Sequence, residues 1–191
     1  KVMLPDPRLS GVAFTGSTET AGIINRQLAS REGPIPVLIA ETGGMNAMIV
    51  DSTALPEQVA KDAITSAFDS AGQRCSALRV LFLQEDVADR MLDEILGAMD
   101  ELKIGDPYDL ATDIGPVIDE EARAALSAHA ERMTRETVLL KRLLLDPALE
   151  GGVFFPPHVF AIPSMSILKR EVFGPILHVV RFDQNRLDAV C

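Results

Sequence analysis

The chain has 191 residues, 47% of them hydrophobic, which is enough material for the core of an ordinary globular domain. No stretch approaches the roughly 20 apolar residues of a membrane span, and the first ten residues lack the apolar region of a signal peptide, so we expect a cytoplasmic protein. The net charge of −10 opposes nonspecific binding to nucleic acid, and no cluster of lysine or arginine overrides it.

The first part of the chain predicts a strand, a turn and a helix. The apolar run Val12–Thr15 is followed by apolar residues spaced as on one face of a helix: Ala21, Ile24 and Leu28. Ser17 or Thr18 can cap this helix by accepting backbone N–H groups. Glu19 would lie favourably in its positive first turn.

Two short apolar segments come next, Val37–Ala40 and Ala47–Val50. Between them stands Thr42-Gly43-Gly44, which suggests two buried strands joined through a tight glycine turn. Glu41 would then lie at the end of the first strand.

The pattern from Pro56 onward predicts a helix with a broad apolar face that stops at Gly72. Cys75 would therefore stand in a loop behind a helix. The run Val80–Leu83 predicts the next strand, and the apolar spacing from Val87 toward Glu101 predicts another helix.

A further helix is expected from Asp119 to about Arg135, with His129 on its apolar side as a core or interface histidine. For Val138–Leu145, periodicity does not choose between strand and helix. Three later apolar segments are predicted as short strands: Val153–Phe155, Val159–Ile162 and Ile176–Phe182. This alternation favours an α/β fold built from parallel βαβ units.

Four motifs follow one another along the chain, and each alone is weak. They are Gly16-Ser17-Thr18-Glu19, Glu41 in Glu-Thr-Gly-Gly, Cys75 in Gly-Gln-Arg-Cys-Ser, and Glu171-Val172-Phe173-Gly174-Pro175. A lone cysteine is usually a small buried hydrophobe, and a lone glutamate is usually solvated surface. Their order and spacing, which supply a base, a thiol and two candidate nucleotide-contact segments, are hard to explain by packing.

Together, the motifs resemble the aldehyde dehydrogenase superfamily, and within it the glutamate-semialdehyde (1-pyrroline-5-carboxylate) dehydrogenase module of proline utilization A. Members of this family combine a Rossmann-like nucleotide domain, a catalytic α/β domain and an oligomerisation element. The resemblance implies that residues 1–40 are the C-terminal part of the NAD-binding domain. Residues 41–191 would be a catalytic domain that is truncated at its C-terminal end.

The same resemblance predicts that the chain is an internal fragment of a longer enzyme. The family carries, upstream of the Gly-Ser-Thr motif, an asparagine that helps bind the oxyanion and a lysine that contacts the adenosine ribose. This sequence contains neither segment, and the aldehyde-anchor loop and the oligomerisation strand would follow Cys191. We therefore expect the fragment by itself to be inactive.

The family register assigns the catalytic chemistry to Cys75 and Glu41. Cys75 would attack the aldehyde carbon as a thiolate, which is a far better nucleophile than a thiol. Glu41 would take a proton from the water that hydrolyses the resulting thioester. The only other cysteine is Cys191, so the sequence offers no disulfide framework and no support for a zinc site.

The resemblance also assigns the cofactor, NAD, with NADP left open. Gly16 and Ser17 match the pyrophosphate contact, although the pattern alone favours an ordinary helix cap. Glu171 matches the carboxylate that accepts the nicotinamide ribose hydroxyls, and Phe173 matches the neighbouring aromatic ring. Ser76 is assigned to the carboxylate of the substrate.

The implied reaction is the oxidation of L-glutamate 5-semialdehyde to L-glutamate in proline catabolism. The parent would be a homo-oligomer or part of a bifunctional proline-oxidising chain, with a small aldehyde as its partner. Two other hypotheses stay open: a non-catalytic structural or partner-binding module with an idle thiol, and a thiol-dependent esterase.

Overall fold

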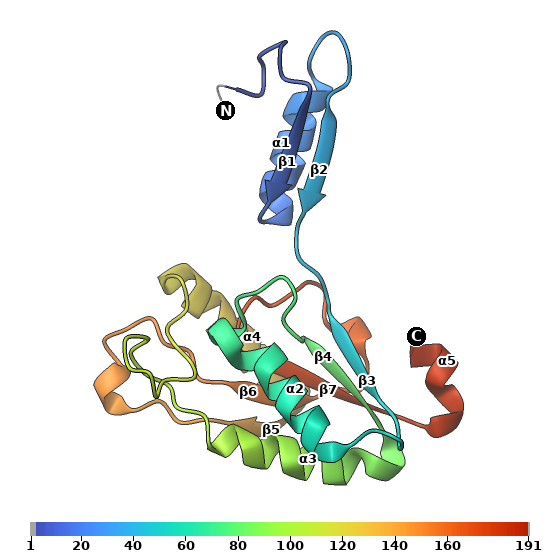
Figure 1. The fold of residues 1–191 in the computed structure, drawn as a ribbon, viewed down its shortest axis with the longest axis vertical. Helices are drawn as coiled ribbons and strands as arrows, with labels where there is room; N and C mark the ends of the chain where they lie inside the picture. Colours follow the sequence, from blue (N-terminus) through green and yellow to red (C-terminus); the bar gives the residue numbers. More distant parts are fainter. Residues whose placement is uncertain (1–2, 191) are drawn as a thin grey trace. The chain divides into compact units, whose positions relative to one another are not determined.

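A computed structural model describes residues 3–190 and divides the chain into two compact units, Lys1–Gly44 and Met45–Cys191 (Figure 1). The division follows Gly44, four residues beyond the expected boundary. The identification of the units as parts of a nucleotide-binding and a catalytic domain stays a prediction.

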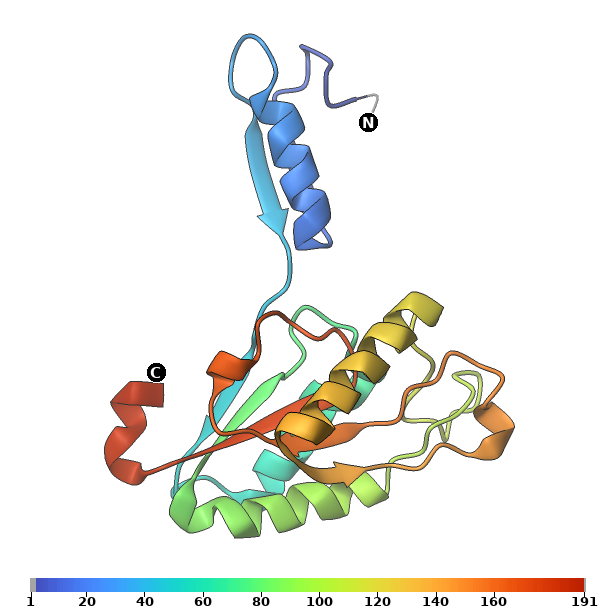
Figure 2. The same ribbon diagram turned by 180° about the vertical axis from the view of Figure 1, so that it is seen from behind.

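The N-terminal unit is one βαβ element. Strand β1 (Gly11–Thr15) and strand β2 (Val37–Glu41) pair in parallel, and their last residues, Thr15 and Glu41, are register partners. Helix α1 (Thr18–Ala29) connects the strands and packs along them (Figures 1 and 2). The carboxyl ends of the two strands therefore meet at the edge where α1 begins.

Capping explains where α1 begins. The Ser17 hydroxyl accepts the backbone N–H of Thr20 at 3.1 Å, and Glu19 lies in the first turn, as the sequence predicts. Ala21 and Leu28 are the buried residues of the helix.

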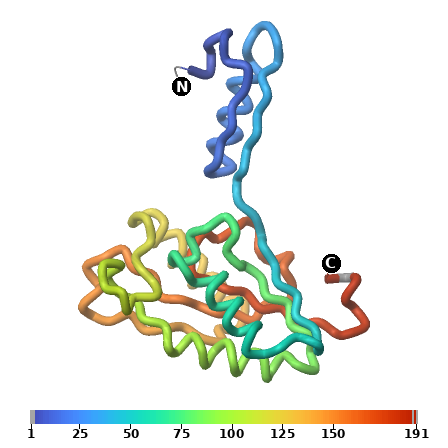
Figure 3. The backbone as a smooth tube through the Cα atoms, viewed as in Figure 1, coloured from blue at the N-terminus to red at the C-terminus, as the bar shows by residue number. Residues whose placement is uncertain are grey.

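The C-terminal unit contains a five-stranded sheet in the order β3-β4-β7-β6-β5. The strands are Ala47–Val50 (β3), Val80–Gln84 (β4), Ile176–Phe182 (β7), His158–Ala161 (β6) and Val138–Arg142 (β5). All neighbouring pairs are parallel except β5 with β6. Figure 3 shows that the C-terminal part of the chain returns to the middle of the sheet, where β7 lies beside β4.

Helices cover both faces of this sheet (Figures 1 and 2). On one face lie α2 (Pro56–Phe68) and α3 (Glu85–Asp100), and on the other lies α4 (Glu120–Glu136). Because β4 and β7 are covered on both sides, their residues do not alternate between buried and exposed, and only Arg181 of the two strands is exposed. Short elements complete the described chain: the 3-10 turns Asp69–Gly72, Pro147–Leu149, Met165–Ile167 and Gln184–Arg186, and the helix α5 (Leu187–Val190).

The core contains a stack of aromatic and imidazole rings. His158 lies between Phe155 and Phe160, with ring centroids 5.0 and 5.8 Å apart, and Phe160 stacks on His178 at 6.3 Å. His129 of α4 meets His178 edge-on, with 2.9 Å between their Nε2 atoms, which confirms its expected place in the core.

The carbonyl oxygen of Arg79 determines which ring nitrogens of this histidine pair carry a hydrogen. It lies 3.0 Å from His178 Nδ1, which must donate because a carbonyl only accepts. His178 Nε2 of the neutral ring is then an acceptor, and His129 Nε2 donates to it. Burial lowers the pKa of His129 to about 3 and that of His178 to about 4, because a charged ring is disfavoured where it is removed from water.

Several sequence predictions are corrected in detail. β2 and β3 do not form a buried pair across a glycine turn, because β2 pairs with β1 in the other unit and is largely exposed. Val153–Phe155 is not a strand: Pro156 and Pro157 follow it without backbone donors, and Phe155 is apolar because it packs in the core. The ambiguous segment 138–145 contains strand β5.

The helix predicted to run from Pro56 to Gly72 ends at Phe68. Ser70, Ala71 and Gly72 follow with φ of 57°, 52° and 64°, so a left-handed turn interrupts the right-handed helix. The hydrophobic spacing continues through this turn because Ala71 is buried there, and spacing alone does not reveal the sign of φ.

In residues 3–190, the structure contains no helix of sufficient length and apolar character to cross a membrane.

The buried histidines predict a pH dependence of stability. Burial lowers the pKa of His158 to about 4, as it does for His178, and that of His129 falls to about 3. In the unfolded chain the three rings take up protons near pH 6.5. Because the unfolded state binds more protons below that pH, the free energy of unfolding should fall between about pH 6.5 and 4, by about 1.4 kcal/mol per pH unit for each of the buried rings His158 and His178 and by less for the partly exposed His129.

Urea denaturation at several pH values checks this prediction. Replacing His158 with Phe, which keeps a flat ring in the stack, should reduce the slope between pH 6.5 and 4. A stability that stays constant through this window would contradict the neutral histidines.

Candidate active site

The loop that carries Cys75 starts from the left-handed turn behind α2. Two of the turn residues, Ser70 and Ala71, adopt positive φ without being glycine, a conformation that costs roughly 1–2 kcal/mol per residue. Surrounding contacts must therefore hold the turn in place. Cys75 itself is exposed, as a nucleophile that must meet a substrate would be.

Close packing of two glycines holds the turn against a second loop. A Cβ atom at Gly72 would collide with the carbonyl oxygen of Gly174 and would lie 2.8 Å from that of Ala67. A Cβ at Gly174 would in turn overlap the side chain of Leu126 in α4. The loop that carries Cys75 and the loop that contains Glu171 are thus in backbone contact.

Asn46 fixes the backbone around Cys75 from the start of β3. Its Nδ2 donates to the carbonyl oxygen of Cys75 at 2.7 Å and to that of Ala77 at 2.9 Å. Both hydrogens of the side-chain amide are donated to the loop, so Asn46 bridges the carbonyl groups of Cys75 and Ala77.

Two side chains before Cys75 bind the loop to the body of the unit. Arg74 Nη2 donates to the carbonyl oxygens of Thr65 at 2.7 Å and Ser66 at 3.2 Å in the last turn of α2, where a cation is favourable. Gln73 Oε1 accepts the backbone N–H of Ile118 at 2.8 Å. These bonds give Arg74 a structural role.

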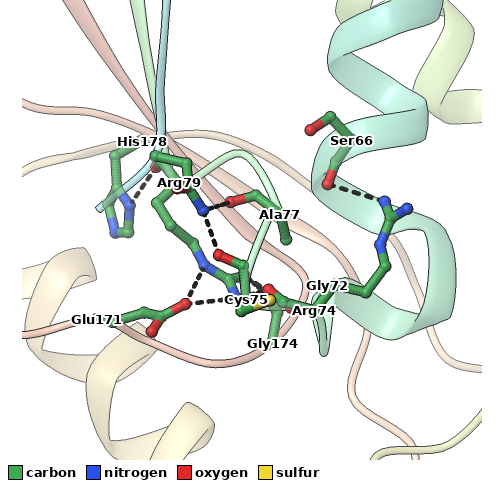
Figure 4. A network of polar contacts seen from close by, with 10 residues as sticks. Ser66, Gly72, Arg74, Cys75, Ala77, Arg79, Glu171, Gly174 and His178 are labelled. Atoms are coloured by element: carbon green, nitrogen blue, oxygen red, sulfur yellow. Dashed lines mark hydrogen bonds and ion pairs between the residues drawn. The ribbon is translucent and has the colours of Figure 1, made fainter. Parts of the chain in front are cut away.

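Arg79 lies at the centre of the site (Figure 4). Nη1 donates to the carbonyl oxygens of Gly72 at 2.7 Å and Gly174 at 3.0 Å, and Nη2 donates to that of Arg74 at 3.0 Å. Nε and Nη2 both reach Oε1 of Glu171, at 3.1 and 2.9 Å. These five bonds match the five N–H donors of a guanidinium group.

The environment of Arg79 is partly apolar. Its side chain is 1% exposed, and its guanidinium carbon lies 5.3 Å from the centre of the Phe173 ring. Burial lowers the pKa of Arg79, while the hydrogen bond and the charge of Glu171 act in the opposite direction. The ion pair therefore keeps a cation where solvent does not reach it.

The C-terminal unit thus brings three predicted site residues into one network. Cys75 is held through its backbone, Glu171 through its carboxylate, and Phe173 through its ring above Arg79. Ser76, the predicted contact of the substrate carboxylate, follows Cys75 and is exposed. The sequence interpretation missed Asn46 and Arg79. An arginine at the head of the apolar run that forms β4 was the available signal for Arg79.

The N-terminal unit brings together Gly16, Ser17 and Glu41. The backbone N–H of Gly16 donates to the carbonyl oxygen of Glu41 at 3.1 Å, so this amide is used inside the unit. The Ser17 hydroxyl already accepts the Thr20 amide, so the earlier first-turn amides, which have no partner within a helix, are the donors that an anion would meet. Glu41 ends β2, as predicted, and lies beside this helix start.

Glu41 and Cys75 belong to different units. Their convergence on one substrate stays a prediction.

Comparison with known proteins gives consistent matches over nearly the whole chain. Residues 1–190 match the sequence model of the Aldehyde dehydrogenase family. The bifunctional protein PutA of Klebsiella aerogenes is 52% identical over 191 residues, covering 96% of this chain. The 1-pyrroline-5-carboxylate dehydrogenase of Geobacillus kaustophilus is 35% identical over 181 residues, covering 92% of it.

Solved structures agree with the sequence matches. A crystal structure of bifunctional proline utilization A has a TM-score of 0.93 and 57% identity, over 98% of this chain and 19% of that one. Betaine aldehyde dehydrogenase from Staphylococcus aureus, solved with NAD+, has a TM-score of 0.89 and 28% identity, over 97% of this chain and 37% of that one. The chain spans only 15% of the Klebsiella protein and 35% of the Geobacillus protein.

The contact between the two loops predicts that Gly72 tolerates no side chain. Gly72→Ala would place a Cβ against the Gly174 carbonyl at a positive φ, and should lower the free energy of unfolding by about 2 kcal/mol or more in urea denaturation. Ser70→Gly, in the same turn but exposed, is the matched control and should stay within about 1 kcal/mol of the unaltered protein. Equal stability of the two variants would contradict the close packing.

Proposed function

Because the chain belongs to the aldehyde dehydrogenase family, we propose that it supplies the thiol, the base and part of the cofactor site of a longer NAD-dependent aldehyde dehydrogenase. The observation that carries the proposal is the exposed Cys75 on a loop whose backbone is held by the partly buried Asn46 and the buried Arg79. An idle surface cysteine needs no such support. A nucleophile does, because a misplacement of about 1 Å can cost about 100-fold in rate.

The first chemical step belongs to Cys75. Its sulfur attacks the aldehyde carbon, which becomes tetrahedral and gathers negative charge on the oxygen. Collapse of this adduct expels a hydride and leaves an acyl thioester on the sulfur. When bound, NAD supplies the acceptor for that hydride.

The second step is hydrolysis, and we assign it to Glu41. The carboxylate removes a proton from water, the water oxygen attacks the thioester, and the thiolate leaves with the carboxylic acid released. Glu41 ends a strand beside a helix start, so its backbone is fixed although its side chain reaches outward. One aldehyde and one water thus give one carboxylate, with two electrons passed to the cofactor.

The residues present fit a dinucleotide. The first turn of α1 offers amides at a positive helix end for a pyrophosphate, with Gly16 and Ser17 exposed there. Glu171 offers carboxylate oxygens for ribose hydroxyls, and Phe173 has an exposed fraction of 46%, which leaves part of its ring for contact. NAD is the cofactor that we infer, and the choice against NADP depends on groups near the adenosine ribose.

For the substrate we propose L-glutamate 5-semialdehyde, oxidised to L-glutamate in proline catabolism. The supporting observations are the relatives named PutA and 1-pyrroline-5-carboxylate dehydrogenase, and the exposed Ser76 beside Cys75. A hydroxyl at this place can donate to the α-carboxylate of the substrate while the aldehyde lies at the sulfur. We place the parent enzyme in the cytoplasm, as a homo-oligomer or as part of a bifunctional chain.

The two roles predict different defects in the complete enzyme. Cys75→Ser should abolish NADH formation from glutamate semialdehyde, because a neutral hydroxyl does not replace the thiolate. Glu41→Gln should retain a burst of one NADH per site and then turn over about 10² to 10⁴ times more slowly, because hydrolysis lacks its base. Stopped-flow absorbance separates burst from turnover.

Glu32→Gln is the matched control for Glu41, since it removes an exposed carboxylate from the same unit. It should leave both phases intact. Full steady-state turnover in Glu41→Gln would remove Glu41 from the mechanism, and NADH formation by Cys75→Ser would refute the thioester route.

The isolated 191-residue chain is expected to form no measurable NADH. The family's oxyanion asparagine and ribose lysine lie in a segment that this sequence does not contain, so charge on the substrate oxygen and the adenosine end would be unsupported. Absorbance at the NADH band with glutamate semialdehyde and NAD checks this. Limiting iodoacetamide, followed by mass spectrometry, should still modify Cys75 faster than Cys191. Equal rates would favour the idle module.

A further inference from the structure

Arg79 carries a positive charge into a place where a charge is costly. It stands at the head of the buried strand β4, and its side chain is 1% exposed. A buried guanidinium is tolerated only when its donors are matched and its charge is paired. All five donors are matched here, and the pairing carboxylate is that of Glu171. The sequence distance between the pair is 92 residues.

The acceptors of Arg79 come from two loops. Gly72 and Arg74 supply carbonyl oxygens just before Cys75, while Gly174 and Glu171 supply a carbonyl and a carboxylate from the other loop. In Figure 4 the guanidinium lies between these two loops, with Glu171 on one side and the backbone of Cys75 on the other. The rigid, planar guanidinium thus connects the loop of Cys75, the proposed nucleophile, with the loop of Glu171, the proposed ribose contact.

We propose that Arg79 is a positioning residue of the dehydrogenase reaction, which holds the Glu171 carboxylate in the orientation that receives the nicotinamide ribose. This inference rests on the proposed function. Nε and Nη2 converge on the same oxygen, Oε1, so the carboxylate is held from one side by two donors. Phe173 lies against the guanidinium, 5.3 Å from its carbon, and both the carboxylate and the ring are therefore set by Arg79.

Lysine does not reproduce this geometry. Its ammonium is a point charge with three donors on a flexible stem, whereas the guanidinium presents five donors in one plane. Arg79→Lys keeps the charge for Glu171 but can replace at most three of the five hydrogen bonds. The variant therefore distinguishes the effect of a positive charge beside Glu171 from the effect of orienting its carboxylate.

The test uses the complete parent enzyme with NAD and L-glutamate 5-semialdehyde. Arg79→Lys should raise KM for NAD by about tenfold or more, the equivalent of one lost hydrogen bond to a charged group. KM for the aldehyde should rise by less than KM for NAD, because Asn46 still holds the carbonyl oxygens of Cys75 and Ala77 when the side-chain bonds of Arg79 are lost. Arg181→Lys is the matched control: Arg181 is an exposed arginine of β7 that pairs with Glu85 and Asp89. It should change neither value.

A double-mutant cycle tests whether Arg79 acts through Glu171. Glu171→Gln alone should also raise KM for NAD. Adding Arg79→Lys to Glu171→Gln should raise it no further, because the carboxylate that Arg79 orients is already gone. If the two effects instead multiply, Arg79 acts elsewhere and the proposal is overturned. A general loss of kcat with KM for NAD unchanged would overturn it as well.

Folding is checked by thermal denaturation of each variant. If Arg79→Lys does not fold, Arg79→Gln, which has two donors and no charge, replaces it in the same cycle. Failure of both to fold would assign Arg79 to the stability of the unit and would overturn the positioning role. Failure of the proposed function has a separate signature: the unaltered enzyme would form no NADH, or Cys75→Ser would leave its formation intact.

Discussion

The charge of Arg79 is the constraint on which the candidate site depends. Water does not reach the guanidinium, so the protein must provide every partner, and it does so with one carboxylate and the carbonyl oxygens of two loops. Neither loop has regular secondary structure of its own. The bonds that satisfy Arg79 therefore also give the loop of Cys75 and the loop of Glu171 a defined shape. The same hydrogen bonds both permit the burial of the guanidinium and order the two loops.

The histidine pair connects this constraint with the core. The carbonyl oxygen of Arg79 accepts a hydrogen bond from the ring of His178, whose other nitrogen meets His129 on α4. Backbone and side chain of one residue thus serve two networks. Because burial favours the neutral form of both rings, protonation of either would oppose the contact between α4 and the sheet. The packing of the core and the geometry of the site are linked through this residue.

The sequence predicted β4 and β7 well, because both are mostly apolar segments, and it predicted the start of α1 from Ser17. It did not predict the left-handed turn after Phe68, since apolar spacing carries no information on the sign of φ. The positions of Cys75 in a loop and Glu41 at a strand end followed from local pattern. Arg79 did not, because its partners are up to 95 residues away and only the folded chain reveals them.

The parallel pairing of β1 with β2 has a consequence for the carboxylate of Glu41. Successive side chains of a strand point to opposite faces, so Glu41 keeps its face only while Thr15 remains its partner. Insertions or deletions in the connection from Ser30 to Pro36 would change the length of a loop and leave that pairing intact. Inserting one amino acid inside β2 would move the Glu41 carboxylate to the opposite face of the two-stranded sheet. Natural variation in length should therefore be confined to the connection and absent from the strand.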